Sequence, residues 1–222
     1  MNKPVKSTYQ LETKVVKAYQ TAFSLFFYLC SLIAFLGFCF STQYLDVEVN
    51  GPSMKPTINQ QWFSPDFTYK RDIVYINFKT PYSKGDIIVV EHNDFVIKRL
   101  IAVGGDSLNV IKNEQDEVEV YVNSSLVVED YVVYKSGLEI TYSNFENLRT
   151  THSHLFEADE LIIPQGYVFY MGDNRGQSQD CSVYGPVSED SVVGKVNIIV
   201  PYGKNFTQTV LLFIWDSILK IF

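Results

Sequence analysis

The stretch Val96-Ile97-Lys98-Arg99-Leu100-Ile101-Ala102-Val103 is an apolar run interrupted by two adjacent cations. Its β-branched residues predict a strand. On a strand, Lys98 shares one face with Val96, Leu100 and Ala102, whereas Arg99 lies on the other face. Apolar neighbours on both sides favour a buried amine, and burial lowers the pKa of a lysine, to about 5–6 in documented cases. A neutral Lys98 amine at physiological pH is therefore physically reachable.

A second stretch, Val49-Asn50-Gly51-Pro52-Ser53-Met54-Lys55-Pro56-Thr57, places a serine in a turn stiffened by glycine and proline. A serine hydroxyl is a poor nucleophile until a nearby base takes its proton, and a neutral lysine can serve as that base. Ser53 and Lys98 therefore predict a nucleophile and its base. The alternative is that Lys98 extends to solvent from an edge strand while Ser53 only shapes a turn.

Short runs rich in valine, isoleucine and aromatic residues recur along the rest of the chain and predict a mainly β fold. Turn signals separate these runs, and Asn93-Asp94 and Asn123-Ser124-Ser125 predict hairpins. The predicted strands are Leu45–Val49, Asp72–Phe78, Asp86–Glu91, Phe95–Val103, Val118–Val122, Leu126–Val128, Tyr167–Met171 and Ser191–Val200.

Ala22 to Phe40 contains 19 residues and no charged side chain. As a helix it would be about 28 Å long, close to the hydrocarbon thickness of a bilayer. Four lysines precede it, and Asp46 and Glu48 follow it, so the positive-inside bias predicts a cytoplasmic N-terminus and a folded domain outside. A cleavable signal peptide is the alternative, but the segment lacks the short apolar core and the A-x-A-like exit that such a peptide has.

These patterns divide the chain into an anchor, a β core and an insertion. The expected segments are a cytoplasmic N-terminus (1–20), a transmembrane anchor (21–41), a catalytic β core (42–107 and 166–205), an inserted β-subdomain (108–165) and an apolar C-terminal tail (206–222). The tail is too short and too charged to span a bilayer comfortably. It is expected to pack on the domain or to lie in the lipid interface, with a second span as the alternative.

Charge and cysteine usage exclude several classes of function. The chain of 222 residues carries 18 basic and 25 acidic residues, and the part after Leu45 has a formal charge of −10. Such a surface repels nucleic acid. Cys181 is the lone cysteine outside the apolar segment, so no intradomain disulfide is possible. His152-x-His154 could ligate a metal on a strand, but its polar neighbours favour an exposed loop, and no cofactor is expected.

Three blocks of the sequence, in this order, resemble bacterial type I signal peptidases of the Gram-positive kind, which are membrane-bound enzymes that remove signal peptides from secreted proteins. The resemblance covers nearly the whole chain from the anchor to about Val200. The blocks are Gly51-x-Ser53-Met54-x-Pro56-Thr57, the run from Val96 to Gly104-Gly105-Asp106, and Gly172-Asp173-Asn174-Arg175-x-x-Ser178-x-Asp180 with Gly185.

The resemblance implies a role for each matched residue. Ser53 would be the nucleophile, Lys98 the general base, and Ser178 a hydrogen-bonding partner that orients the lysine amine. Met54 would lie beside the pocket for the P1 residue of the substrate, with Val49 and Ile97 lining it. The remaining matched residues would support the site, namely Gly51, Arg99, Asp173, Arg175 and Asp180.

The implied fold is a β-rich catalytic core with a smaller inserted β-subdomain and one N-terminal transmembrane helix. The implied partners are preprotein signal peptides with small residues at P1 and P3, and membrane lipid. The sequence carries no indication of oligomeric state.

Several positions depart from the family pattern, among them Gly176-Gln177, which stand where Asp-Asn is commoner. Gly51 stands where some members carry a serine that donates to the oxyanion, so backbone N–H groups, notably that of Ser53, would take this role. Cys181-Ser182 follows Asp180 where the family usually has Ser-Arg, so the usual Asp–Arg ion pair is expected to be missing.

The departure after Asp180 keeps open a non-catalytic or specialised accessory protein for pilus or surface-protein assembly, although such a protein should have lost Ser53 or Lys98. A self-cleaving repressor is a weaker alternative, because it would need a DNA-binding domain where this chain has an apolar anchor.

Overall fold

The computed structural model describes residues 5–63, 68–92, 94–132, 135–207 and 209. The chain divides into two compact units, Met1–Tyr44 and Leu45–Phe222. The predicted apolar tail from Val210 to Phe222 lies outside the described residues.

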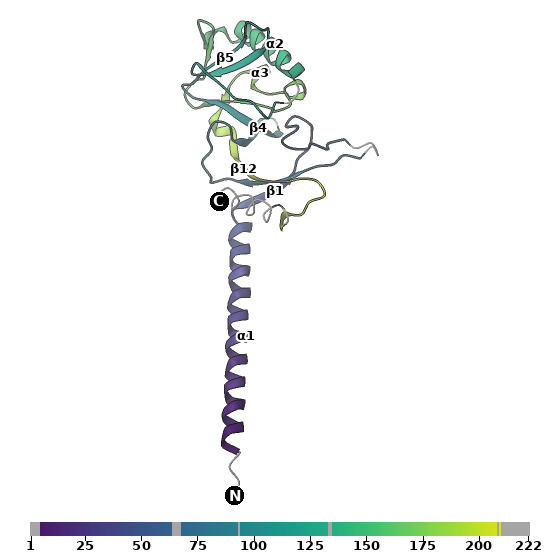
Figure 1. Cartoon of the computed structure of the whole chain (residues 1–222). Helices are drawn as coiled ribbons and strands as arrows, with labels where there is room; N and C mark the ends of the chain where they lie inside the picture. The colour runs from purple at the N-terminus through teal and green to yellow at the C-terminus, as the bar shows by residue number, and fades with distance from the viewer. Residues whose placement is uncertain (1–4, 64–67, 93, 133–134, 208, 210–222) are drawn as a thin grey trace. The chain divides into compact units, whose positions relative to one another are not determined.

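The first unit is dominated by one helix, α1 (Val5–Ser41), drawn in purple in Figure 1. Its portion Thr13–Ser41 has 29 residues, none of them buried, and is long and apolar enough to cross a membrane. At about 1.5 Å per residue this portion is longer than the hydrocarbon core of a bilayer. The helix therefore fits a membrane anchor, and it begins well before the segment 21–41 that the sequence predicted.

The second unit contains two antiparallel sheets (Figure 1). The seven-stranded sheet has the order β1-β2-β12-β3-β4-β10-β11. Its strands are β1 (Tyr44–Glu48), β2 (Ile73–Asn77), β3 (Ile87–His92), β4 (Asp94–Val103), β10 (Tyr167–Met171), β11 (Val187–Ser188) and β12 (Val192–Val200).

The five-stranded sheet has the order β7-β6-β5-β9-β8 and is formed by the middle of the chain. Its strands are β5 (Ser107–Lys112), β6 (Val118–Val122), β7 (Ser125–Leu126), β8 (Phe156–Glu157) and β9 (Glu160–Ile162). The predicted β-rich fold is confirmed, since every predicted strand overlaps an observed one.

Helix α2 (Lys135–Thr151) is the main element that the sequence did not predict. This part of the chain was read as polar stretches within a β-subdomain. Phe145 and Leu148 are fully buried, and Leu138 packs against the same core. Their spacing is that of one apolar helix face, a signal that the polar residues between them concealed. The remaining short helices are α3 (Cys181–Tyr184) and the 3₁₀ turns η1 (Ser153–Leu155), η2 (Arg175–Gln177) and η3 (Glu189–Ser191).

Strand β4 lies between two hydrophobic clusters. The larger cluster joins Ile88 and Leu100 of the seven-stranded sheet to Leu108 of the other sheet and to Phe145 of α2. The smaller cluster lies around Val49, Met54, Ile58, Ile76 and Val89, with Ile97 packed against it. Because both faces of β4 are covered, polar side chains in the middle of this strand are removed from water, Lys98 almost completely and Arg99 largely.

Candidate active site

Lys98 and Ser53 are brought together by strand β4 and the loop that follows β1. The Lys98 Nζ atom donates to Ser53 Oγ at 2.9 Å and to the Ile97 carbonyl at 3.1 Å. Lys98 is only 5% exposed and lies opposite Ile88 in the β3–β4 pair. The alternative of a lysine extending to solvent from an edge strand is therefore wrong.

The electrostatic environment of Lys98 favours a neutral amine. Burial lowers the pKa of Lys98 from its ordinary value, and the negative charge of Asp180 opposes this only in part. Within the described part of the chain, the Lys98 ammonium has no carboxylate close enough for an ion pair. An amine in this setting can accept a proton, which is the chemical property that a general base requires.

Buried side chains of the smaller hydrophobic cluster hold the Ser53 loop in place. Met54 and Ile58 are buried in the smaller hydrophobic cluster. The Asn59 side chain donates to the carbonyls of Val49 and Gly51, each at 2.9 Å. These contacts fix both ends of the turn that carries the serine. Asn59 was not among the predicted site residues, and its signal in the sequence was a short polar residue directly after an isoleucine.

The segment Gly172–Asn174 holds the Ser53 loop from the other side. The Asn174 N–H donates to the Ser53 carbonyl at 2.9 Å, and the Asn174 side chain donates to the Pro52 carbonyl at 3.1 Å. A Cβ atom at Gly172 would lie 2.5 Å from the Ser53 carbonyl oxygen and 2.3 Å from Ser178 Oγ. Glycine is therefore required at this position by close approach.

Asp173 and Arg99 form a buried ion pair beside this segment. Arg99 donates to both Asp173 carboxylate oxygens, through Nε at 2.8 Å and Nη2 at 2.6 Å. The Thr57 hydroxyl also donates to Asp173. Burial alone would lower the pKa of Arg99, but the hydrogen bonds and charge of Asp173 outweigh it and raise that pKa. Arg99 and Asp173, both expected to support the site, are thus bonded to each other.

Ser178 does not make the bond that was expected of it. Its Oγ atom is buried and has no hydrogen-bond partner among the described residues. The expected hydrogen bond from Ser178 to the Lys98 amine is therefore not formed. Lys98 instead uses the Ile97 carbonyl as its second partner, an intrastrand contact that sequence spacing cannot reveal.

Asp180 is supported by hydrogen bonds where an ion pair with arginine is missing. Its carboxylate accepts from the Gly172 N–H at 2.8 Å, from the Ser182 N–H at 3.1 Å and from the Ser182 hydroxyl at 2.8 Å. No cation pairs with Asp180 in the part of the chain that the structure describes. Ser182 thus donates to one carboxylate oxygen of Asp180 and Gly172 to the other, so neither oxygen is left without a donor.

A cavity of about 470 Å³ opens beside Ser53 and Lys98. Its lining includes Val49 and Ile97, as the sequence predicted. Met54 does not line it: this side chain packs behind the wall, in the same apolar cluster as Val49. Gly51 adopts a left-handed conformation with φ of 101°, and a Cβ atom there would meet nothing within 4 Å. A side chain at position 51 would therefore meet no neighbouring atom, although the backbone conformation favours glycine.

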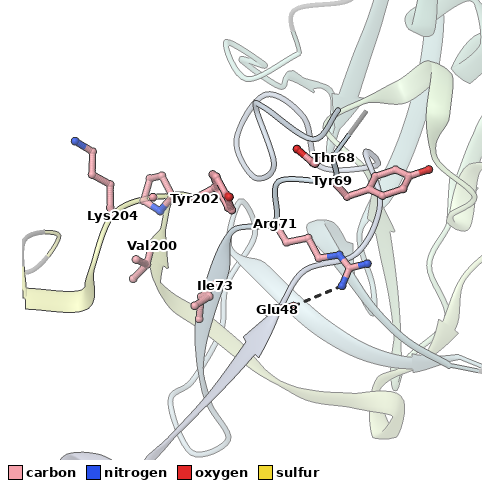
Figure 2. A pocket seen from close by; sticks show the side chains of 10 residues that line it. Glu48, Thr68, Tyr69, Arg71, Ile73, Val200, Tyr202 and Lys204 are labelled. Atoms are coloured by element: carbon pink, nitrogen blue, oxygen red, sulfur yellow. Dashed lines mark ion pairs between the residues drawn. The ribbon is translucent and has the colours of Figure 1, made fainter. Parts of the chain in front are cut away.

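A larger cavity of about 630 Å³ contains neither Ser53 nor Lys98. Figure 2 shows its lining at the ends of β1, β2 and β12, where Arg71 forms an ion pair with Glu48 at 3.5 Å. Of these two cavities, the smaller one is the candidate active site, because its lining includes a serine hydroxyl bonded to a buried amine.

A buried lysine amine bonded to a serine hydroxyl, in a chain with a β-rich fold and an apolar N-terminal helix, indicates the class of serine peptidases. The family model described as signal peptidase, peptidase S26, matches residues 19–201. The chain belongs to this family.

Curated relatives agree with this assignment. The chain is 31% identical over 156 residues to signal peptidase IB of Staphylococcus aureus (strain Mu50), covering 67% of this chain and 73% of that protein. It is 29% identical over 174 residues to signal peptidase I U of Bacillus subtilis (strain 168), covering 72% and 78% of the two chains. A solved structure of a signal peptidase I from Enterococcus faecalis V583 matches with a TM-score of 0.39 and 28% identity, covering 53% of this chain and 98% of that one.

Proposed function

We propose that this chain is a membrane-anchored endopeptidase that removes N-terminal signal peptides from exported preproteins through a Ser53/Lys98 dyad. The observation that carries the proposal is the 2.9 Å hydrogen bond between a buried lysine amine and a serine hydroxyl at the mouth of a cavity. Membership in the signal peptidase family supplies the class of substrate.

The chemistry proceeds by acyl transfer. Neutral Lys98 takes the Ser53 proton as Oγ attacks the scissile carbonyl, and it then gives that proton to the leaving amine. The Ser53 backbone N–H stabilises the oxyanion, since Gly51 offers no hydroxyl. A water molecule, activated by the same amine, hydrolyses the acyl-enzyme and restores the serine.

An open strand edge supports docking of an extended substrate. Strand β4 pairs with β3 along Asp94–Arg99, but its pairing with β10 begins only at Arg99. Among the described residues, no strand pairs with the opposite edge of Asp94–Lys98 next to the cavity, where the Ile97 carbonyl accepts from Lys98 Nζ. Such an unpaired edge accepts an added strand. The apolar wall formed by Val49 and Ile97 would select small P1 and P3 side chains.

The anchor and the site together suggest how substrate reaches the enzyme. We propose that α1 spans the cell membrane once, with a cytoplasmic N-terminus and the catalytic unit outside, because lysines precede the span and acids follow it. Translocated signal peptides would emerge on the same side. The organisation into a core (42–107, 166–205) and an insertion (108–165) belongs to this proposal.

Cleavage assays with matched variants test the dyad. Ser53→Ala and Lys98→Ala should each abolish processing of a preprotein in detergent, with the cut site located by mass spectrometry. Ser143→Ala on the exposed face of α2 and Lys112→Ala on β5 are controls that should cleave at the wild-type rate. Wild-type processing by either dyad variant would show that the assignment is wrong.

A further inference from the structure

The segment 127–132, which connects β7 to α2, crosses from the five-stranded sheet to the site residues. We infer that Glu129 and Tyr131 of this segment are positioning residues for the proposed reaction, acting on Ser53 through Arg175 and Arg99. The inference rests on the proposed function and adds to it a part of the chain that the family motifs do not include.

Glu129 is the carboxylate partner of a buried arginine. Its Oε1 atom accepts from Arg175 Nη2, and the two side chains are 10% and 1% exposed. The Tyr131 hydroxyl donates to the same carboxylate oxygen at 3.1 Å. Arg175 Nη1 is buried without a partner among the described residues, so Glu129 provides the carboxylate that holds this guanidinium. A desolvated charge depends strongly on such a partner.

Arg175 connects Glu129 to the Gly172–Asn174 segment, which packs against the Ser53 loop. Its Nε atom donates to the Gly172 carbonyl at 3.2 Å, while the Gly172 N–H donates to Asp180 at 2.8 Å. Both sides of the Gly172 residue are thereby fixed. There is almost no free space between Gly172 and the Ser53 carbonyl, since a Cβ atom would approach that oxygen to 2.5 Å. A shift of Gly172 must therefore displace the backbone of the serine.

The same segment also contacts the second arginine of the site. The Arg99 guanidinium lies over the Tyr131 ring, 4.0 Å from its centroid, and Arg99 holds Asp173 in the next position of the Gly172–Asn174 segment. From the side of α2, a Cβ atom at Gly137 would approach Arg175 Cβ to 2.9 Å. The insertion therefore restrains the loop 172–178 through the Glu129–Arg175 ion pair, the contact of Tyr131 with Arg99, and the close approach of Gly137 to the 175–176 backbone.

Kinetics of Glu129→Gln test the inference. We expect kcat to fall about tenfold with KM unchanged, because a small misplacement of the serine affects the chemical step and not the cavity walls. Rates are normalised to the amount of enzyme that forms acyl-enzyme in a burst, so that loss of folded protein does not count. Glu119→Gln on β6 is the matched control, since Glu119 also accepts from a neighbouring tyrosine, Tyr121, at 2.7 Å. It should leave kcat unchanged.

A double variant identifies the route of the effect. If Glu129 acts through Arg175, then Glu129→Gln combined with Arg175→Gln should be no slower than Arg175→Gln alone. Multiplied losses would overturn the inference, as would a wild-type kcat in Glu129→Gln. If Glu129→Gln does not fold, the double variant is used in its place, because it leaves no buried charge without a partner. A kcat equal to that of Arg175→Gln would then support the inference. A wild-type kcat in the double variant would overturn it.

Hydrogen exchange separates this inference from the proposed function. Glu129→Gln should speed amide exchange in residues 172–178, and Glu119→Gln should not. Unchanged exchange there would overturn the positioning role even if the enzyme cleaves preproteins. Failure of the wild-type chain to cleave, or cleavage by Ser53→Ala, would instead overturn the dyad while faster exchange still showed the restraint on the loop.

Discussion

The two faces of strand β4 carry adjacent cations in opposite environments. On one face, burial lowers the pKa of Lys98, whose amine bonds to a hydroxyl and a carbonyl. On the other face, the hydrogen bonds and charge of Asp173 outweigh burial and raise the pKa of Arg99. Both side chains are largely removed from water, so burial alone does not set the direction of the pKa shift. The directly bonded carboxylate explains why the Arg99 pKa rises while the Lys98 pKa falls. Because a guanidinium keeps its proton in either setting, only the lysine face can carry a proton acceptor.

Replacing Lys98 by arginine should have the largest effect on the cleavage rate. Lys98→Arg keeps the positive charge but cannot lose its proton. If Lys98 is the base, kcat/KM for preprotein cleavage should fall by about 10³-fold or more. Initial rates measured by gel or mass spectrometry test this, with Lys112→Arg on β5 as the control. A Lys98→Arg enzyme that kept a tenth of the wild-type rate would show that neutrality at this position is not required.

Removing each cation in turn should change stability in opposite directions. Arg99→Met leaves the Asp173 carboxylate buried without its cation, which should lower the free energy of unfolding by about 3–5 kcal/mol. Lys98→Met removes an amine whose pKa is lower in the folded state than its ordinary value of 10.5. The Lys98 amine therefore binds its proton more tightly in the unfolded wild-type chain than in the folded one. At neutral pH this difference in proton affinity lowers the stability of the folded state.

We accordingly expect Lys98→Met to raise the free energy of unfolding at pH 7 by about 1–2 kcal/mol. Wild-type stability should rise with pH between the lowered pKa of Lys98 and 10.5, because the unfolded state binds more protons there. Lys98→Met should lose this part of the slope. Urea unfolding at several pH values measures both effects, and a destabilised Lys98→Met with an unchanged slope would contradict the assigned pKa direction.

The opposite pKa shifts of Lys98 and Arg99 should also appear in the pH dependence of cleavage, as a smaller effect than those of the substitutions. Below the lowered pKa of Lys98, kcat/KM should fall about tenfold for each pH unit, because only the neutral amine accepts the serine proton. Arg99 stays charged throughout this range and contributes no inflection. A cleavage rate that rose as the pH fell below about 6 would be incompatible with an amine base.

The sequence predicted the features of the two β4 faces that depend on the local pattern of apolar and turn residues. The apolar run around Lys98 indicated a buried lysine, and the turn at Ser53 was placed correctly beside it. Partners that arise from tertiary packing were not predictable. Glu129 and Tyr131 reach the site from a segment far along the chain, and no spacing rule encodes that approach. Helix α2 was missed because its apolar residues are spaced among polar ones.

The bond expected between Ser178 and Lys98 failed for a related reason. Family motifs indicate which residues gather at the site, but they do not indicate which acceptor a flexible amine chooses. In this structure the Lys98 amine bonds to the Ile97 carbonyl, and Ser178 Oγ remains without a partner among the described residues.

The smallest expected effect concerns Asp180, the carboxylate that most opposes the lowered pKa of Lys98. Ser182→Ala removes the 2.8 Å hydrogen bond to Asp180 and leaves that oxygen with the backbone donor alone. The free energy of unfolding should fall by about 0.5–1.5 kcal/mol. A less well stabilised Asp180 charge acts more strongly on the nearby amine, so the acidic limb of the cleavage profile should move to slightly higher pH. Ser188→Ala, which removes the serine that caps η3 and accepts from the Asp190 N–H, is the control and should leave that limb unchanged. A shift of the limb to lower pH in Ser182→Ala would mean that the Ser182 hydroxyl affects Lys98 by some route other than the charge of Asp180.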